Sequence, residues 1–142
     1  MGGNVISKTD LAYTAGIIDG EGCISIVPRK LDGKVYHSLF VAVTCTDTVI
    51  VPWLKATFGG NTHQVKERRK NHRDMLQWGI STQEAEDFLR RILPWLRLKK
   101  PQAELALYFR TLKRDGYTVS KKTFDERDRC YRKLRAMHGR GR

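Results

Sequence analysis

Two carboxylate residues, Asp19 and Glu21, alternate with two glycines, Gly20 and Gly22, near the start of the chain. The pattern around them predicts that a helix ends and a strand begins at this point. The carboxyl end of a helix already carries partial negative charge and unpaired carbonyl groups. Two carboxylates beside it make a site that favours a cation, and hard oxygen ligands of this kind suit Mg²⁺. The simpler alternative is a helix–strand joint with a chance acidic turn.

The elements that position these acids can be read on either side of them. An apolar pattern predicts a helix over residues 10–19, with Ser7 as a candidate N-cap. A strand is expected over residues 22–29. Ala12 and Gly16 are small residues four positions apart, and Ala15 lies beside them. Small residues on a helix allow a second helix to approach closely.

Residues 14–22 resemble the LAGLIDADG motif of the homing endonucleases. The residues that match it directly are Ala15, Gly16, Ile18, Asp19 and Gly22. Glu21 stands at the position of the family's metal-binding acid, which is usually Asp. Thr14 replaces the first Leu of the motif, and Gly20 replaces the second Ala. A nine-residue motif that combines a helix, a turn and an acid is more specific than a glycine pattern alone.

The resemblance implies a DNA endonuclease that uses Mg²⁺, for which other divalent cations can substitute. Glu21 would be its catalytic metal ligand, and the carbonyl of Gly20 would add a second oxygen. Asp19 is expected to be a structural cap of the junction rather than a ligand. Residues 96–102 resemble the family segment in which a lysine approaches the scissile phosphate, which makes Lys99 the second expected catalytic residue. The alternative for Lys99 is a solvated connector.

Composition supports a nucleic-acid partner. The chain has 142 residues and 27 Lys+Arg against 15 Asp+Glu, a net charge of +12, and a field of this size favours a polyanion. No apolar run is long enough to span a membrane. Three widely spaced cysteines form no zinc or disulfide pattern, so we expect an intracellular protein of the cytoplasm or an organelle matrix, not a secreted one. Cys23 and Cys45 are expected to be buried.

The pattern of elements predicts an α+β fold. Its core has the order αββαββα, with a curved four-stranded antiparallel sheet, helices on one face and extra C-terminal helices. The further expected strands cover residues 35–46, 62–69 and 74–81. Residues 1–112 are expected to form the endonuclease domain. Residues 113–142 would be a basic helical extension packed on it, whose charge is either a solvated face or an additional phosphate contact.

The uncovered face of the sheet is the expected DNA-binding surface, because β-ribbons fit the major groove. The side chains expected on this face are Ser25, Arg29, Tyr36, Ser38, Lys66, Arg68 and Gln77. Arg69, Lys70 and Arg73 lie in or beside a predicted turn and suit phosphate contacts. The resemblance implies the same arrangement, a curved saddle of strands on duplex DNA.

A single motif supplies a single active site, whereas cutting both DNA strands needs two. We therefore expect a homodimer with its interface at Ala12, Ala15 and Gly16, which brings both Glu21 side chains close together. The predicted protein is a site-specific homing endonuclease, encoded within an intron, that binds a long pseudo-palindromic site. An intron RNA maturase and a catalytically silent DNA-binding regulator remain as alternatives. A basic ribosomal-type RNA binder would explain the charge but not the acidic helix end.

Overall fold

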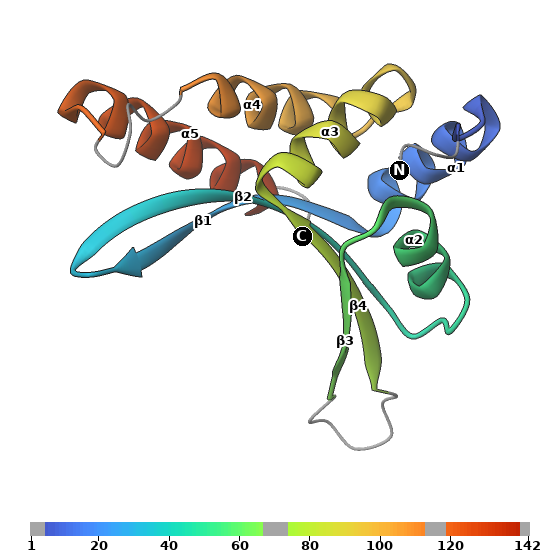
Figure 1. The fold of residues 1–142 in the computed structure, drawn as a ribbon. Helices are drawn as coiled ribbons and strands as arrows, with labels where there is room; N and C mark the ends of the chain where they lie inside the picture. The colour runs from blue at the N-terminus through green and yellow to red at the C-terminus, as the bar shows by residue number, and fades with distance from the viewer. Residues whose placement is uncertain (1–4, 67–73, 113–118, 140–142) are drawn as a thin grey trace.

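The structure, a computed structural model, describes residues 5–66, 74–112 and 119–139 (Figure 1). The helices and strands, in chain order, are α1 (Lys8–Glu21), β1 (Gly22–Leu31), β2 (Lys34–Cys45), α2 (Ile50–Phe58), β3 (Asn61–Val65), β4 (Met75–Ser81), α3 (Thr82–Ile92), the short 3₁₀ helix η1 (Leu93–Trp95), α4 (Lys100–Thr111) and α5 (Lys121–Gly139). The expected α+β architecture and the order of its core elements are confirmed.

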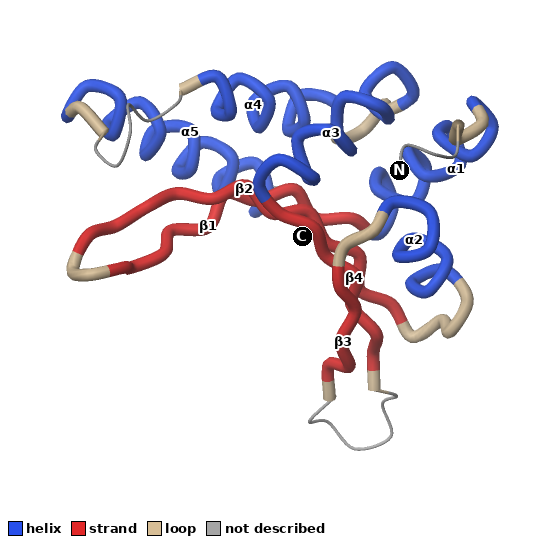
Figure 2. Tube along the Cα trace, in the orientation of Figure 1, coloured by secondary structure: helices blue, strands red, loops and turns tan. Residues whose placement is uncertain are grey.

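The four strands form one antiparallel sheet in the order β1-β2-β4-β3. The helices gather over one face of this curved sheet, and the other face is open (Figure 2). Alternate residues of β1, β2 and β4 point into the core beneath the helices, among them Ile24, Val41 and Trp78, which are fully buried. The residues between them point to the open face, because side chains alternate along a strand.

Several boundaries differ from the sequence-based expectation. Helix α1 is longer at both ends than residues 10–19, because the Ser7 hydroxyl accepts a hydrogen bond from the Asp10 backbone N–H at 3.1 Å and extends its first turn. Strand β3 was expected over residues 62–69; the structure gives Asn61–Val65, and residues 67–73 lie outside the described part. Helix α5 begins at Lys121, where the Ser120 hydroxyl caps it by accepting a hydrogen bond from the Thr123 backbone N–H.

Helix α5 packs against β1, β2 and α4. Its Cys130 is fully buried and joins the hydrophobic core. The guanidinium of Arg127, whose residue is only 8% exposed, donates to the carbonyl of Leu112 and, at 2.8 Å, to that of His37. It also lies 4.3 Å from the centroid of the Phe109 ring, within cation–π range. One buried cation therefore joins the last helix to both the sheet and α4.

Burial corrects one expectation about the cysteines. Cys23 is exposed and Cys45 is half-buried, whereas Cys130 is the cysteine in the core. Cys23 is exposed because it occupies the open-face parity of β1, between the buried Gly22 and Ile24. Among the described helices, none is both long enough and apolar enough to cross a lipid bilayer.

Candidate active site

The end of α1 presents the Glu21 carboxylate to solvent. Glu21 is the last residue of the helix, and both Glu21 and Gly20 are exposed. The backbone N–H of Gly22 closes the helix by donating to the carbonyl of Ile18. A Cβ atom on Gly22 would lie 2.8 Å from the Ile18 Cα, so only glycine fits at this turn. The close approach of these two residues fixes the direction in which β1 leaves the helix.

The positively charged side chain of Lys99 lies at this helix end. Its ammonium Nζ donates to the carbonyl of Ile18 at 3.0 Å and to that of Gly22 at 2.6 Å. A positive group at the carboxyl end of a helix satisfies its last carbonyls and offsets its partial negative charge. The partial negative charge at the carboxyl end of α1 is therefore offset by Lys99, a residue far along the chain. The ammonium has three N–H donors, of which these two bonds use two.

Asp19 holds the backbone of the same segment. Its Oδ2 accepts a hydrogen bond from the Arg97 backbone N–H, and its Oδ1 accepts one from the Lys99 backbone N–H, both at 2.9 Å. Both carboxylate oxygens face the segment before α4, which agrees with the structural role expected for Asp19. The two acids of the junction thus differ, because one is committed to the fold and the other is exposed.

The oxygen donors at the helix end suit a hard divalent cation in type but not in number. Glu21 offers one carboxylate, and Gly20 offers one backbone carbonyl. Among the described residues, no group of three or more His, Cys, Asp and Glu side chains could hold a metal ion. Mg²⁺ prefers six oxygen ligands in near-octahedral geometry. A complete ligand set at Glu21 would therefore need oxygens from outside one copy of this chain.

The open face carries most of the side chains expected there. Pairing places Ser25 opposite Phe40, Val27 opposite Ser38 and Arg29 opposite Tyr36. Gln77 of β4 lies opposite Thr44 of β2 on the same face. Ser25 is partly used within the sheet, because its hydroxyl donates to the Phe40 carbonyl at 3.3 Å.

Strand β3 presents the opposite set of residues from the one expected. It pairs with β4 so that Asn61 faces Gly79 and His63 faces Gln77, which puts Asn61 and His63 on the open face. Gln64 belongs to the other face. Lys66 follows the last residue of β3, so its place on the face of Gln77 stays a prediction. All five β3 residues except the half-buried Val65 are exposed, so no burial pattern in the sequence could have revealed its register.

The remaining expected DNA contacts cannot be placed. Arg68, Arg69, Lys70 and Arg73 lie outside the described residues. Near them, the ends of β3 and β4 extend beyond the layer of helices (Figure 1). At these ends Gln64 is exposed, whereas Val65, Met75 and Leu76 are half-buried.

The outer surface of α1 consists of small residues. Gly16 and Gly20 are exposed, Ala12 is partly exposed, and Tyr13 beside them is 52% exposed. A Cβ atom added to Gly16 or to Gly20 would meet no other atom within 4 Å. The fold of one protomer therefore has no need of glycine at either position.

Ala15 does not belong to that outer surface. It is fully buried in the protomer's own core together with Ile18. Its side chain has no area left to contact a partner, so its assignment to a dimer interface is wrong. Ala15 lies one residue from Gly16, and this difference of about 100° around the helix axis turns it from the outer face to the core.

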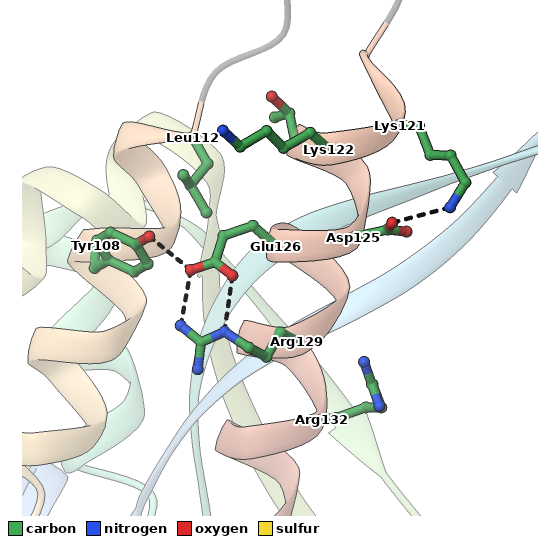
Figure 3. A pocket seen from close by; sticks show the side chains of 9 residues that line it. Tyr108, Leu112, Lys121, Lys122, Asp125, Glu126, Arg129 and Arg132 are labelled. Carbon is green, nitrogen blue, oxygen red and sulfur yellow. Dashed lines mark hydrogen bonds and ion pairs between the residues drawn. The ribbon is translucent and has the colours of Figure 1, made fainter.

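Several basic side chains of α5 form ion pairs with acidic side chains of the same helix. A hollow of about 1120 Å³ between α4 and α5 is shown in Figure 3. At its wall, Glu126 accepts hydrogen bonds from Arg129 and from the Tyr108 hydroxyl, and these bonds lower the pKa of Glu126 to about 2. Lys121 forms an ion pair with Asp125 at 3.1 Å. Much of the positive charge on this helix is thus balanced locally.

Comparison with known proteins shows a likeness of fold rather than of sequence. No family model matches the chain, and no curated protein sequence matches it significantly. Solved structures do match. The homing endonuclease I-CvuI, in complex with its target, has a TM-score of 0.73 at 21% identity, over 89% of this chain and 80% of that one. The archaeal intron-encoded homing endonuclease I-Vdi141I, complexed with DNA, has a TM-score of 0.74 at 15% identity, over 90% and 83%.

A third structure matches over a smaller share of its own length. The LAGLIDADG homing endonuclease I-GzeII, in complex with a DNA target, has a TM-score of 0.67 at 15% identity. The match covers 82% of this chain but only 42% of the I-GzeII chain. Together with the helix order, the sheet topology and the acid at the end of α1, these matches show that this chain has the fold of the LAGLIDADG homing endonucleases.

Proposed function

We propose that the protein is a site-specific DNA endonuclease of the LAGLIDADG homing type, which cuts both strands of a duplex by hydrolysing phosphodiester bonds. The observation that carries this proposal is the end of α1, which ends at an exposed Glu21 and whose Ile18 and Gly22 carbonyls bind the ammonium of Lys99. This pair sits in a fold shared with DNA-bound homing endonucleases. An RNA-binding or regulatory protein of this fold would not need both a carboxylate and an ammonium at the end of α1.

In this mechanism, Glu21 holds the catalytic cation by its carboxylate, with the Gly20 carbonyl as a second donor. Mg²⁺, when bound, supplies a polarised water and stabilises the leaving oxygen. Lys99 contributes its remaining N–H donor and its positive charge at the phosphate, where negative charge grows in the transition state. Asp19 keeps Lys99 in place through the backbone and does not touch the substrate.

DNA would lie along the open face of the sheet. Ser25, Arg29, Tyr36, Ser38 and Gln77 are the proposed DNA-binding residues of β1, β2 and β4. Lys66, an exposed residue directly after β3, remains a proposed contact. Arg68, Arg69, Lys70 and Arg73 remain proposed phosphate contacts on sequence grounds. The net charge of +12 supports this partner, because phosphate neutralisation supplies most of the affinity of nonspecific binding.

The proposed active assembly is a homodimer formed through the outer surface of α1, at Ala12 and Gly16. A helix-interior glycine costs about 1 kcal/mol relative to alanine, and the protomer gains no space from Gly16. A second α1 helix packed against this surface would explain the glycine. The match to about half of I-GzeII also favours two copies. The dimer would bring two Glu21 carboxylates together and so supply the oxygens that one protomer lacks.

We further propose that residues 1–112 form the endonuclease domain and that residues 113–142 form an extension of it. The packing of Arg127 and Cys130 supports this division, because α5 adds to an existing core rather than building its own.

Cleavage selection on a randomised duplex library with Mg²⁺ tests the function. Wild-type protein should enrich a long, two-fold related site among the cut products. Glu21→Gln should bind this site and leave it uncut. The matched control is Glu104→Gln, which changes an exposed glutamate on α4 and should cut like the wild type. Equal cutting by Glu21→Gln would refute the active-site assignment, and specific binding without any cutting by the wild type would favour the regulator.

A further inference from the structure

A hollow of about 220 Å³ opens on the DNA-facing side of the sheet, where β2, β4 and β3 lie side by side. The open-face residues around it are Phe40, Asn61, His63, Gln77, Gly79 and Ser81. None of the α1 or Lys99 machinery lines this hollow. It is therefore a separate feature of the same surface, and its shape and polarity can be considered independently.

Glycine makes room for the apolar wall of the hollow. A Cβ atom on Gly79 would lie 2.6 Å from the Phe40 ring, so the ring occupies the space that any other residue would fill. Gly79 has no side chain, so the far edge of the Phe40 ring reaches over β4 and forms an apolar surface beside the polar rim. The arrangement is fixed by the backbone of β4 and does not depend on a flexible side chain.

The polar side of the hollow has a defined orientation. The Thr44 hydroxyl donates to the Gln77 Oε1 at 3.2 Å, between directly opposed residues of β2 and β4. Thr44 does not line the hollow, whereas Gln77 does. Because the oxygen end of the amide turns toward Thr44, the Nε2 amino group is the end left for an occupant. An amino group offers two N–H donors and no acceptor.

The charge of the rim argues against a phosphate. Of the described residues that line the hollow, none is Lys or Arg, and one, Glu84, is an acid. A phosphate would be repelled by Glu84 and would find no cation. An uncharged base edge with an acceptor next to an apolar group would fit both walls.

We propose, resting on the proposed DNA-binding function, that this hollow reads a thymine in the major groove. Thymine is the base that presents an acceptor, O4, beside a C5-methyl group. The methyl group would pack on Phe40, and O4 would accept from the Gln77 amino group. Cytosine would direct its amino donor at that amino group. Guanine offers acceptors but no methyl, and the paired adenine contact needs both ends of a free amide.

Two base analogues separate the two walls of the hollow. The test uses full-length Glu21→Gln protein and the duplex site recovered from the library. One thymine at a time is replaced in one half-site. Uracil removes only the methyl group and should weaken binding about fourfold at the thymine that is read, the value of one buried methyl group. 5-Methylcytosine, placed opposite guanine so that the duplex stays paired, keeps the methyl group but replaces the acceptor with a donor, and it should weaken binding roughly 10- to 100-fold.

Two variants assign each effect to its residue. Thr44→Val removes the hydroxyl that orients the Gln77 amide and keeps the shape of the residue 44 side chain. The amide can then turn either end to the base, so the preference for thymine over 5-methylcytosine should fall. Phe40→Leu should reduce the preference for thymine over uracil. Thr62→Val, on the other face of β3 opposite Trp78, is the control and should change neither preference.

The outcomes distinguish this inference from the proposed function. If the protein binds no duplex with preference, the proposed function fails. If it binds and cuts a defined site but no thymine shows both analogue effects, only the thymine assignment is overturned. A position that depends on Thr44 and selects adenine or guanine would also overturn it, because the amide would then present a different edge.

Discussion

Asp19 and Lys99 are joined by a direct hydrogen bond although eighty positions separate them in the sequence. The Asp19 Oδ1 accepts the Lys99 backbone N–H at 2.9 Å, while the Lys99 ammonium reaches back to the carbonyls of Ile18 and Gly22. The helix end and the segment before α4 therefore form one rigid unit. Its rigidity is relevant to catalysis, because a displacement of about 1 Å of a positioning group can cost on the order of a hundredfold in rate.

Removing the Asp19 carboxylate should loosen this unit. Asp19→Ala leaves the backbone N–H groups of Arg97 and Lys99 without their acceptor, and we expect a loss of about 2–3 kcal/mol in the free energy of unfolding. Urea unfolding at neutral pH measures this loss. Asp87→Ala, which alters an exposed carboxylate on α3, should change stability by less than about 0.5 kcal/mol. Equal stability of Asp19→Ala and wild type would contradict the role of Asp19.

Lys99→Met should reduce the single-turnover cleavage rate by about 10²–10³-fold, the usual effect of losing one group that stabilises transition-state charge. Binding of the duplex should change by only a few-fold, because one phosphate contact is a small part of the interface. Lys100→Met is the matched control, since Lys100 is the adjacent lysine and begins α4. If both variants cut equally well, Lys99 is an ordinary surface lysine.

Gly16→Ala should affect folding and assembly in opposite directions. Alanine favours a helix over glycine by about 1 kcal/mol, and nothing in the protomer obstructs its methyl group, so the dilute protein should become more stable. The same methyl group would hold two α1 helices apart, so the proposed dimer should dissociate, which sedimentation would measure. Ala136→Gly, at an exposed position of α5, should lower stability and leave assembly unchanged. A Gly16→Ala protein that dimerises normally would place the interface elsewhere.

Glu86 predicts a pH dependence of stability. Its hydrogen bond from Arg110 at 2.7 Å, aided by one from Arg90, holds the pKa of Glu86 below its usual 4.5 although partial burial opposes this. A lowered folded pKa stabilises the protein above pH 4.5, and this contribution is lost as the pH falls through the folded value. Glu86→Gln should therefore cost about 1–3 kcal/mol at pH 7.

The difference between wild type and Glu86→Gln should shrink as the pH is lowered below 4.5, because the wild-type carboxyl then becomes neutral as well. Urea unfolding of both proteins from pH 7 to pH 3 measures it. A difference that stays constant with pH would mean that the ion pair with Arg110 contributes nothing beyond a neutral hydrogen bond.

The sequence predicted what is local and periodic. The acidic turn at the end of α1, the two hairpins and the helices over one face follow from hydrophobic alternation and capping residues. Ala15 was misassigned, because the middle of α1, residues 11–18, has no charged residue on any side and its buried side is not distinguished by polarity. The register of β3 was missed because both of its faces are exposed. The bonds of Asp19 to residues 97 and 99 depend on tertiary packing, for which a single sequence carries no signal.

The ribbon formed by the outer ends of β3 and β4 extends past the helices (Figure 1). Its exposed side chains, such as Gln64, lie outside the core, so most replacements of them should leave folding intact. The α1–Lys99 unit, in contrast, tolerates little change at Gly22 or Asp19. The chain thus separates the residues that it must keep from those that it is free to vary. Under the proposed function, new target sequences could be acquired by mutation of the ribbon without loss of the α1–Lys99 unit.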